Sequence, residues 1–462
     1  MRIHFIAIGG SIMHSLAIAL KRAGHKVTGS DDAIHEPSHT RLEDNGLLPP
    51  EMGWFAARIT PDIDAIILGM HAFEDNPELK TAQDLGLKMY SFPEFIYEHS
   101  RNKQRVVIAG SYGKTTITSM VMHVLRGLGR EFDYLVGAQV PGFDNPVRLS
   151  EDAPLIIMEG DEYFASKMDM RPKFLVYKPH VALISGISWD HINVFPTEVE
   201  YKRQFGMLIA EMPKAGYLIY NEGDKELKEM MIPMKDVESL YIHAYSVPTY
   251  RIKDEKYTIT LGNTTIGGLT SIGGEKIQVE VIGKHNMLNI AAAWKVCEQI
   301  GVELKAFLTQ IASFKGAKSR LETIVNEPKR IVFKDFAHAP IKVSATVEAI
   351  AEMYATKRTL IACLELHTFS SLNKQFIKQY NGALKGAKHK IVFINKHTLE
   401  AKRMPPISRE EVLAAFGDKS IIYLSDPADL AKTLKQVRTG NDVYLMMSSG
   451  DFGGLKLSEV GR

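Results

Sequence analysis

The sequence is poor in cysteine and has no long hydrophobic run. Its two cysteines, Cys297 and Cys363, lie far apart and lack the spacing of a metal site. This argues against a disulfide framework and favours a reducing compartment. No segment reaches the roughly 18 consecutive apolar residues typical of a bilayer-spanning helix, and residues 1–10 lack the features of a signal peptide. These absences predict a cytoplasmic protein.

The chain also lacks an excess of charge of either sign. It has 56 basic and 54 acidic residues, which gives a formal net charge of +2. This balance offers no electrostatic reason to expect nucleic acid or a membrane as a partner, so we expect small-molecule substrates. The 462 residues, 45% hydrophobic and 24% charged, are typical of a globular protein of about three domains. We expect a monomer or a homodimer.

A strand, a glycine-rich turn and a helix are predicted in succession between residues 106 and 128, with the helical pattern running from Ile117 to Leu128. A turn of this kind, together with the helix N-terminus, forms a site for a polyphosphate. Lys114 is expected to reach the β- and γ-phosphates of a nucleotide and Thr115 to offer a hydroxyl to Mg²⁺. Ile108 stands where the common nucleotide loop has its first glycine, which leaves a plain turn with a helix cap as the alternative. The turn reads Gly110-Ser111-Tyr112-Gly113-Lys114-Thr115-Thr116.

Acidic residues follow the apolar run at 155–158, starting with Glu159. A carboxylate at a strand end near a phosphate loop is a suitable ligand for nucleotide-bound Mg²⁺. His191 follows another apolar run, at 181–185, and is either a second element of this metal site or a structural histidine.

The amino-terminal segment has the pattern of a strand at 3–8, a helix at 12–23 and a second strand at 26–29. Its first turn lacks two glycines of the dinucleotide fingerprint, so it is either an ordinary turn or a site for a nucleotide diphosphate at the helix N-terminus. The candidate residues are Gly9, Gly10 and Ser11 in this turn and Ser30 and Asp31 after the second strand.

Strands and helices alternate through most of the chain, which predicts largely parallel sheets. Residues 98–104 are polar and read as a linker, and residues 248–282 read as antiparallel hairpins followed by helices at 286–300 and 303–312. We therefore predict an α/β protein of three domains: a Rossmann-like domain over 1–100, a central P-loop ATPase-type domain with small antiparallel elements over 101–317, and a Rossmann-like domain over 318–462. The further expected strands are 65–69, 89–91, 174–177, 330–333, 359–363, 390–394, 421–424 and 443–447.

Three polar clusters remain. Asn286 opens the helix at 286–300 and is either a cap or a ligand contact. Asp335 to Pro340 and Ser448 to Gly454 each follow a strand of the third block. Polar residues at the carboxyl end of a parallel strand are often ligand contacts, although both clusters could be plain turns.

Taken together, these segments resemble the Mur ligase family over nearly the whole chain. The family implies ATP-dependent formation of an amide between the carboxylate of UDP-N-acetylmuramate, or a peptide derivative of it, and an amino acid or peptide. Departures from its usual pattern include Tyr112 and Ala339, each in place of a histidine. The matching segments are Ala109-Gly110-Ser111-x-Gly113-Lys114-Thr115-Thr116, Glu159-x-Asp161-Glu162-Tyr163, Asp190-His191, His285-Asn286-x-x-Asn289, Arg320-Leu321-Glu322 and Asp335-Phe336-Ala337-His338-x-Pro340.

The resemblance implies a role for each matched position. Catalysis would rest on Lys114, Glu159 and His191, and Mg²⁺ would be held by Thr115, Glu159 and His191. UDP-sugar would be bound by Gly9, Gly10, Ser11, Ser30 and Asp31. The residues implied for ATP are Gly110, Ser111, Gly113, Lys114, Thr115, Thr116, Asn286, Asn289, Arg320 and Asp335.

Within the family, the sequence is most similar to members that attach the tripeptide L-alanyl-γ-D-glutamyl-meso-diaminopimelate. Three features suggest this: Ser11-Ile12 in the first turn, Phe174 to Pro179, and the tail Ser449-Gly450-x-Phe452-Gly453-Gly454. Attachment of L-alanine is the first alternative. An ATPase or kinase without ligase activity and a nucleotide-binding homologue without catalysis are the others.

Overall fold

The computed structural model describes residues 1–462 except 71, 167–168, 190–193, 235–238, 263–264, 267–268, 271–273 and 318–319. The chain divides into two compact units. One comprises Met1–Gly110, Ile117–Gly186 and Arg203–Ala244, and the other comprises Ser111–Thr116, Ile187–Lys202 and Tyr245–Arg462. Each unit is described by itself, and the three predicted domain ranges stay a prediction.

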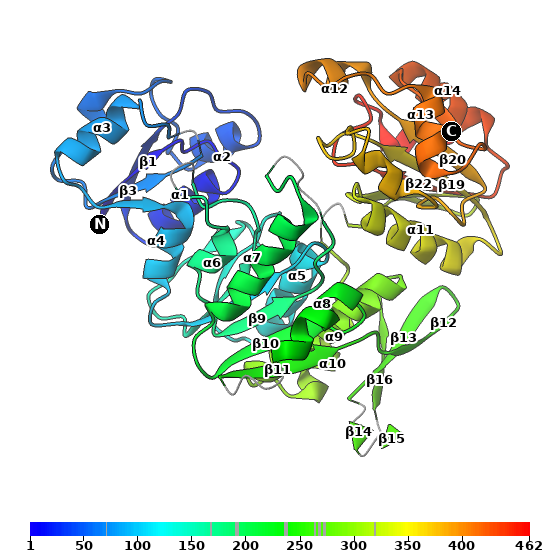
Figure 1. The fold of residues 1–462 in the computed structure, drawn as a ribbon, viewed down its shortest axis with the longest axis horizontal. Coiled ribbons are helices and arrows are strands. Elements are labelled where there is room, and N and C mark those ends of the chain that lie inside the picture. The colour runs from blue at the N-terminus through cyan, green and yellow to red at the C-terminus, as the bar shows by residue number, and fades with distance from the viewer. Residues whose placement is uncertain are drawn as a thin grey trace. The chain divides into compact units, whose positions relative to one another are not determined.

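A parallel four-stranded sheet begins the first unit, in the order β2-β1-β3-β4 (Figure 1). The predicted strand–helix–strand pattern is confirmed, but β1 ends earlier than expected because Ala7 adopts a left-handed backbone with φ 71°. The order of strands reverses beside β1, so the turn after β1 lies where ligands bind in open α/β sheets. The elements are β1 Arg2–Ile6, α1 Met13–Arg22, β2 Lys26–Ser30, α2 Ser38–Asp44, β3 Ala65–Leu68, α3 Pro77–Asp84, β4 Met89–Ser91 and α4 Phe92–His99.

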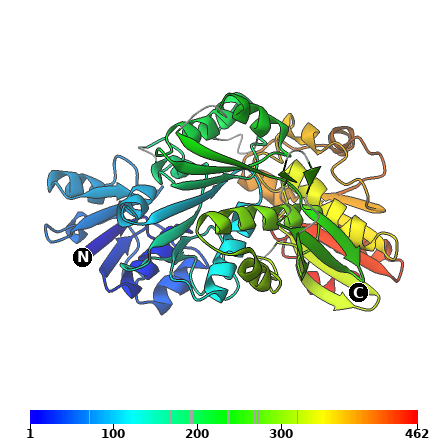
Figure 2. The same cartoon turned by 90° about the horizontal axis from the view of Figure 1, so that it is seen from below.

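The central sheet has seven strands in the order β11-β10-β9-β5-β8-β6-β7, and its long strands lie side by side in Figure 2. Its middle strand, β5, is buried from Arg105 to Ala109, as a strand covered on both faces must be. The elements are β5 Gln104–Ala109, α5 Lys114–Gly127, β6 Asp133–Leu135, β7 Val147–Arg148, β8 Leu155–Glu159, α6 Lys173–Val176, β9 Val181–Ile184, α7 Glu198–Ala210, β10 Gly216–Asn221, α8 Lys225–Met231 and β11 Leu240–Tyr245.

Two sequence predictions for this region were wrong. The apolar run at 174–177 is not a strand, because Lys173–Val176 forms the short helix α6 after Pro172. A run of four apolar residues is compatible with either a buried strand or a buried helical turn, so its periodicity could not decide. The range predicted for the linker, 98–104, was too long, because α4 ends at His99 and β5 begins at Gln104, so that only residues 100–103 connect them.

The hairpins predicted within 248–282 are confirmed. Strands β12 and β13, and then β13 and β16, pair in antiparallel fashion. The hydroxyls of Tyr250 and Tyr257 each donate a hydrogen bond of 2.9 Å to the carboxylate of Glu352, which fastens this sheet to helix α11 (Pro340–Tyr354). The elements are β12 Thr249–Lys253, β13 Lys256–Leu261, β14 Thr265–Ile266, β15 Leu269–Thr270, β16 Glu275–Val279, α9 Lys284–Gln299 and α10 Leu304–Ile311.

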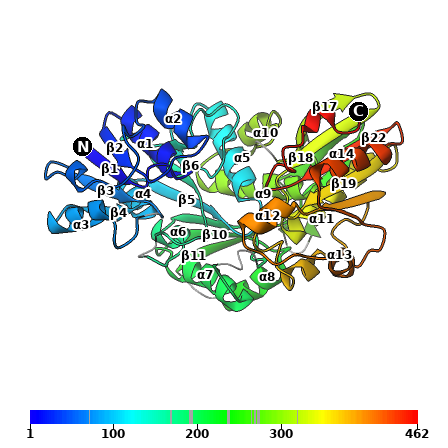
Figure 3. The ribbon, with the colours of Figure 1, turned by 90° about the horizontal axis from the view of Figure 1, so that it is seen from above.

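The last sheet has the order β17-β18-β22-β19-β20-β21, and β17, β18, β22 and β19 are labelled in Figure 3. It is parallel except for β17, an antiparallel edge strand that the sequence analysis missed. Alternating exposed residues and a bulge near Val325 weaken the apolar pattern of β17. The other elements are β17 Glu322–Glu327, β18 Arg330–Asp335, β19 Thr359–Glu365, β20 His389–Phe393, α12 Lys396–Ala401, α13 Arg409–Phe416, β21 Ile422–Leu424, α14 Pro427–Gln436 and β22 Asp442–Met447.

Cys297 and Cys363 are both buried free thiols. Among the described residues, no helix has the length and apolar character needed to cross a bilayer. The cytoplasmic location and the monomeric or dimeric state stay predictions.

Candidate active site

The predicted phosphate loop follows the central strand β5 directly. Gly110 has φ 118°, and a Cβ at this position would clash with the Ser185 side chain and backbone. Ser185 comes directly after the neighbouring strand β9, and its N–H donates to the Ala109 carbonyl at 3.0 Å. Glycine at position 110 therefore lets the loop begin where two strand ends meet.

The rest of the loop leads into the first turn of α5, which begins at Lys114 rather than at the predicted residue 117. The Ser111 hydroxyl accepts a hydrogen bond of 3.2 Å from Tyr201, while Thr115 and Thr116 are buried at the helix start. The first N–H groups of a helix have no partner within the helix and carry a partial positive charge. The loop thus has the local form of an anion site, with Lys114 half-buried beside those groups.

Glu159 ends β8, the strand beside β5, and lies in register with Ile108. Its Oε2 accepts the N–H of Gly137 at 2.8 Å, so the carboxylate is held at the carboxyl edge of the sheet. His191 lies outside the described residues. No cluster of three or more histidine, cysteine or acidic side chains suited to a metal occurs in the described part of the chain. The carboxylate of Glu159 and the hydroxyl of Thr115 are nonetheless the hard oxygen donors that Mg²⁺ prefers.

The predicted UDP-sugar residues lie around the turn after β1. The N–H of Gly9 donates to Asp31 Oδ2 at 2.7 Å, and a Cβ at Gly9 would lie 2.9 Å from both that oxygen and Ile34 Cγ1. Glycine is therefore required for this close approach. Gly10 and Ser11 are exposed, whereas Asp31 is buried.

Ser30 differs from these residues because its hydroxyl already has two protein partners. It donates to Glu78 Oε1 at 2.7 Å and accepts from Arg58 at 2.9 Å. Glu78 is itself fully buried and also accepts the N–H of Phe55 at 2.9 Å. A buried polar network thus lies beneath the end of β2, and a contact between Ser30 and a ligand stays a prediction.

The carboxyl of Asp31 supplies a test by pH. Burial, with a smaller effect of Asp32, raises its pKa from 3.8 to about 6. Between those values the folded chain keeps a proton that the unfolded chain releases, so this group lowers the free energy of unfolding as pH rises. In Asp31→Asn, the free energy of unfolding should therefore fall less between pH 4 and pH 7 than in the wild-type chain, by up to about 3 kcal/mol. Urea unfolding at several pH values would measure the difference. Asp44→Asn, an exposed change in α2, should leave the profile unaltered, and an unchanged profile in Asp31→Asn would contradict the assignment.

Asn286 and Asn289 lie in the first turns of α9. The helix cap is Gly283, with φ 92°, so the capping alternative for Asn286 is not what the structure shows. Instead, the Asn286 side-chain amide donates to the Ile282 carbonyl at 2.8 Å, and Asn289 donates to Asn286 Oδ1 at 3.2 Å. Both asparagines are largely buried, and their contact with ATP stays a prediction.

Asp335 ends β18, and its carboxylate accepts the N–H groups of Leu321 at 2.7 Å and Ala337 at 2.6 Å. Burial raises its pKa to about 6, although Arg320 and these two N–H groups oppose the rise. The Arg320 guanidinium lies over the Phe336 ring, 4.7 Å from its centroid. The segment around Arg320 and Leu321 therefore lies beside the end of β18, and a contact of Arg320 or Asp335 with ATP stays a prediction.

A cavity of 270 Å³ in the second unit lies between Ser111 of the phosphate loop and the residues that begin α11. It is lined by Ser111, Trp189 and the first turn of α11, including Lys342. Convergence of a phosphate loop, a tryptophan and a lysine on one cavity suits a polar, charged ligand.

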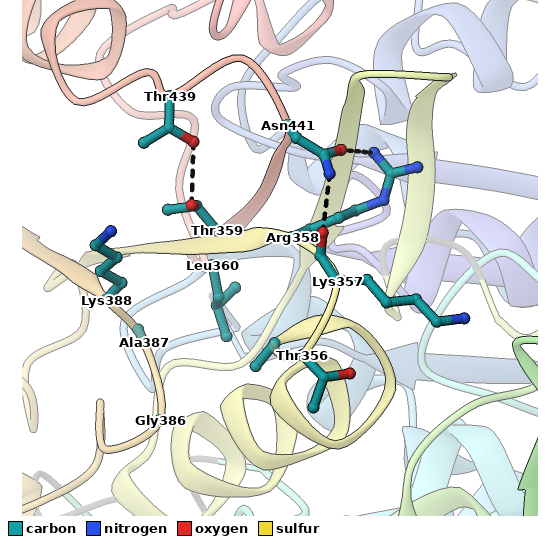
Figure 4. Close-up of a pocket in the computed structure, with 11 residues that line it drawn as sticks. Thr356, Lys357, Arg358, Thr359, Leu360, Gly386, Ala387, Lys388, Thr439 and Asn441 are labelled. Carbon is teal, nitrogen blue, oxygen red and sulfur yellow. Dashed lines mark hydrogen bonds between the residues drawn. The ribbon is translucent and has the colours of Figure 1, made fainter.

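A second, larger cavity of 490 Å³ lies at the amino ends of β19 and β22 (Figure 4). Lys357, Arg358 and Lys388 are among its lining residues, but Arg358 donates to Asn441 at 3.0 Å and Lys357 lies 3.9 Å from Glu255. It contains none of the predicted site residues. Ligands of parallel sheets bind at the carboxyl ends of strands, so the smaller cavity is the better candidate.

Sequence reasoning missed one carboxylate at the functional edge. Glu365 ends β19, is almost completely buried, and accepts hydrogen bonds from the loop that follows β22. The apolar run at 359–363 predicts a strand that ends two residues before Glu365. A carboxylate two residues beyond that run, at a strand end, was the signal that could have revealed it.

The folds and loops described above define an α/β enzyme built around a phosphate-binding loop. Three family descriptions match the chain in order: Mur ligase family, catalytic domain, over residues 2–104; Mur ligase middle domain, over residues 108–297; and Mur ligase, glutamate ligase domain, over residues 319–450. The chain belongs to the Mur ligase family, whose members use ATP to form amide bonds in peptidoglycan precursors.

Similarity to individual proteins extends over nearly the whole chain. The UDP-N-acetylmuramate–L-alanyl-γ-D-glutamyl-meso-2,6-diaminoheptandioate ligase of Haemophilus influenzae is 28% identical over 98% of this chain and 97% of its own. The UDP-N-acetylmuramate–L-alanine ligase of Carboxydothermus hydrogenoformans is 26% identical over 100% of this chain and 97% of its own.

Solved structures show the same fold. A murein peptide ligase from Psychrobacter arcticus matches with a TM-score of 0.64 at 23% identity, covering 100% of this chain and 99% of its own. The UDP-N-acetylmuramate-alanine ligase of Thermotoga maritima matches with a TM-score of 0.70 at 18% identity, covering 100% and 98%.

Proposed function

We propose that this chain joins L-alanyl-γ-D-glutamyl-meso-diaminopimelate to the carboxylate of UDP-N-acetylmuramate. The observation that carries the choice of amine is the tail after β22, where Gly453 and Gly454 have φ 69° and 83°. A left-handed backbone favours glycine, so both glycines are needed for the conformation of this tail. The same two glycines belong to the pattern that resembles the tripeptide-adding members of the family. The similarity to the Haemophilus influenzae protein supports the same choice.

The reaction begins with activation of a poor electrophile. The muramate carboxylate attacks the γ-phosphorus of ATP, which releases ADP and gives an acyl phosphate. Phosphoryl transfer depends on positioning and charge neutralisation, which we assign to the N–H groups of the loop and to Lys114. Mg²⁺ would be held by Thr115, Glu159 and His191 and would neutralise charge on the phosphates when bound.

In the second step the amine attacks the acyl carbon and inorganic phosphate leaves, so that the amide forms and one proton is released. A base must take that proton; His191 and His338 are both candidates. We place adenine near Asn286 and Asn289, and the ribose and phosphates near Asp335 and Arg320. The turn of Gly9, Gly10 and Ser11, with Ser30 and Asp31, is assigned to the UDP-sugar.

The test supplies ATP, Mg²⁺ and UDP-N-acetylmuramate with either the tripeptide or L-alanine, and measures phosphate release and product mass. We expect release that depends on the tripeptide and a product of the mass of the joined species. Stimulation by L-alanine alone would favour the alternative supported by the Carboxydothermus hydrogenoformans relative. Release without any amine would indicate an ATPase, and no release would contradict catalysis.

A further inference from the structure

Three neighbouring parallel strands of the last sheet end at the same level. Asp335 of β18 and Leu364 of β19 both lie in register with Met447 of β22. The next residues are Glu365 on β19 and Ser448 after β22, and the Ser448 N–H donates to the Asp335 carbonyl at 2.9 Å. Glu365 is thus placed at the carboxyl edge, where α/β sheets bind their ligands.

The carboxylate of Glu365 organises the loop after β22. Its Oε2 accepts hydrogen bonds from the Ser448 hydroxyl and, at 2.9 Å, from the Phe452 N–H. The Ser448 hydroxyl in turn accepts the Gly450 N–H at 2.6 Å. Glu365 is 1% exposed, and its partners in the described part of the chain are these neutral donors rather than a basic side chain. Burial of a charge without a counter-charge is costly, so the loop donors must compensate for it.

Gly450 is packed against this carboxylate. A Cβ at position 450 would lie 3.0 Å from Glu365 Oε2 and 2.7 Å from Cδ2 of His367. Phe452, with φ 57°, is 2% exposed and belongs to the apolar core below the sheet. The loop is therefore held by the burial of Phe452 in the core and by its hydrogen bonds to Glu365. His367 lies beside Gly450 of the same loop.

One polar atom of the loop is left without a partner. The Ser449 hydroxyl oxygen is buried and forms no hydrogen bond with any described group. Buried hydroxyls are normally satisfied, and such an exception at a strand edge points to a ligand. Ser449 follows Ser448, the residue that Glu365 holds, so the carboxylate sets the position of this hydroxyl.

We propose that Glu365 is a positioning residue for the amine substrate, since it holds residues 448–454 in the shape that presents the Ser449 hydroxyl to the incoming amino acid or peptide. This inference rests on the proposed function, because it assigns the amine to this edge. Glu365 does not react; it acts through the loop. Ser449 is the group that contacts the substrate.

The matched control is Asp442, at the amino end of β22. It is also buried, at 2% exposed, and its carboxylate accepts the N–H groups of Thr439, at 3.0 Å, and Gly440, at 2.9 Å. Both carboxylates thus accept backbone N–H groups of a neighbouring loop, at opposite edges of one sheet. Only Glu365 lies at the edge assigned to the substrate.

The experiment compares Glu365→Gln, Ser449→Ala and Asp442→Asn in the full chain. For the first two, we expect KM for the tripeptide to rise about tenfold, with kcat and the KM values of ATP and UDP-N-acetylmuramate changing less than about twofold. Asp442→Asn should lower the melting temperature as much as Glu365→Gln does but leave every KM unchanged. Equal KM values in Glu365→Gln and Asp442→Asn would show a purely structural role and overturn the inference.

Amide hydrogen exchange separates this inference from the proposed function. Exchange at Gly450 and Phe452 should be slow in the wild-type chain, slower with tripeptide, and fast in Glu365→Gln with or without it. Slowing by tripeptide without any turnover would leave the positioning role standing and contradict only the ligase proposal. No effect of tripeptide on residues 448–454 of the wild-type chain would overturn the inference even if ligation occurs.

Discussion

Lys114→Ala is expected to lower kcat for amine-dependent phosphate release by about 100- to 1,000-fold, the usual effect of removing one preorganised donor from developing transition-state charge. Lys114 is the first residue of α5 and stands beside N–H groups that have no partner within the helix. In the proposed mechanism its ammonium adds a full charge to their partial charges, next to the transferred phosphoryl group. Stopped assays with purified protein would measure the loss.

The matched change is Lys225→Ala. Lys225 is likewise the first residue of a helix, α8, but is 88% exposed, and we expect its removal to leave kcat within about twofold. Both variants should keep the wild-type melting temperature within a few degrees. A Lys114→Ala enzyme with full activity and intact ATP dependence would remove this loop from the mechanism.

Glu78→Ala is expected to lower the free energy of unfolding by about 3–5 kcal/mol, because it leaves several buried donors without an acceptor. Glu78 is fully buried in α3 and accepts hydrogen bonds from Ser30 at 2.7 Å and from the Phe55 N–H at 2.9 Å. His4 Nε2 lies 3.4 Å from its other oxygen. Urea unfolding at neutral pH would measure the change.

The loss in the free energy of unfolding caused by Glu78→Ala should become smaller as pH falls. Burial alone would raise the pKa of Glu78, but the hydrogen bonds from His4, Phe55 and Ser30 outweigh it and hold the pKa below 4.5. A lowered pKa stabilises the fold fully above pH 4.5, and this stabilisation disappears as pH falls through the lowered value. The difference in the free energy of unfolding between the wild-type chain and Glu78→Ala should therefore narrow at acidic pH.

Two variants in the same helix serve as controls. Glu78→Gln keeps an acceptor for Ser30 and Phe55 and should cost less than Glu78→Ala, whereas Asp84→Ala, at the exposed end of α3, should change stability by less than about 0.5 kcal/mol. Equal stability of Glu78→Ala and Asp84→Ala would show that the network contributes nothing. Because Ser30 borders the predicted nucleotide turn, Glu78→Ala should also raise KM for UDP-N-acetylmuramate.

Local patterns allowed much of the fold to be predicted. Alternation of apolar runs with helical periodicity gave the parallel sheets, and the glycine-rich turn before Lys114 gave the start of α5 to within three residues. Period-two patterns at 257–261 and 276–282 predicted the antiparallel sheet. These features could be read because each depends on residues close together in the chain. The roles of Glu159, Asn286 and Asp335 came instead from the family resemblance and stay predictions.

Features that join distant residues could not be read in this way. Four apolar residues at 174–177 fit a strand or a helix equally, and only packing decided for α6. The bulged edge strand β17 gains its place by pairing with β18.

The sequence by itself determined the order of strand, glycine-rich loop and the strand that ends at Glu159, because each is a short run with its own local pattern. The tertiary structure alone decided which carboxylates are buried and what they hold. Glu78 lies 48 residues from Ser30, and Glu365 lies 87 residues from Phe452. No local pattern marks such pairs, since their hydrogen bonds exist only after distant segments of the chain have come together.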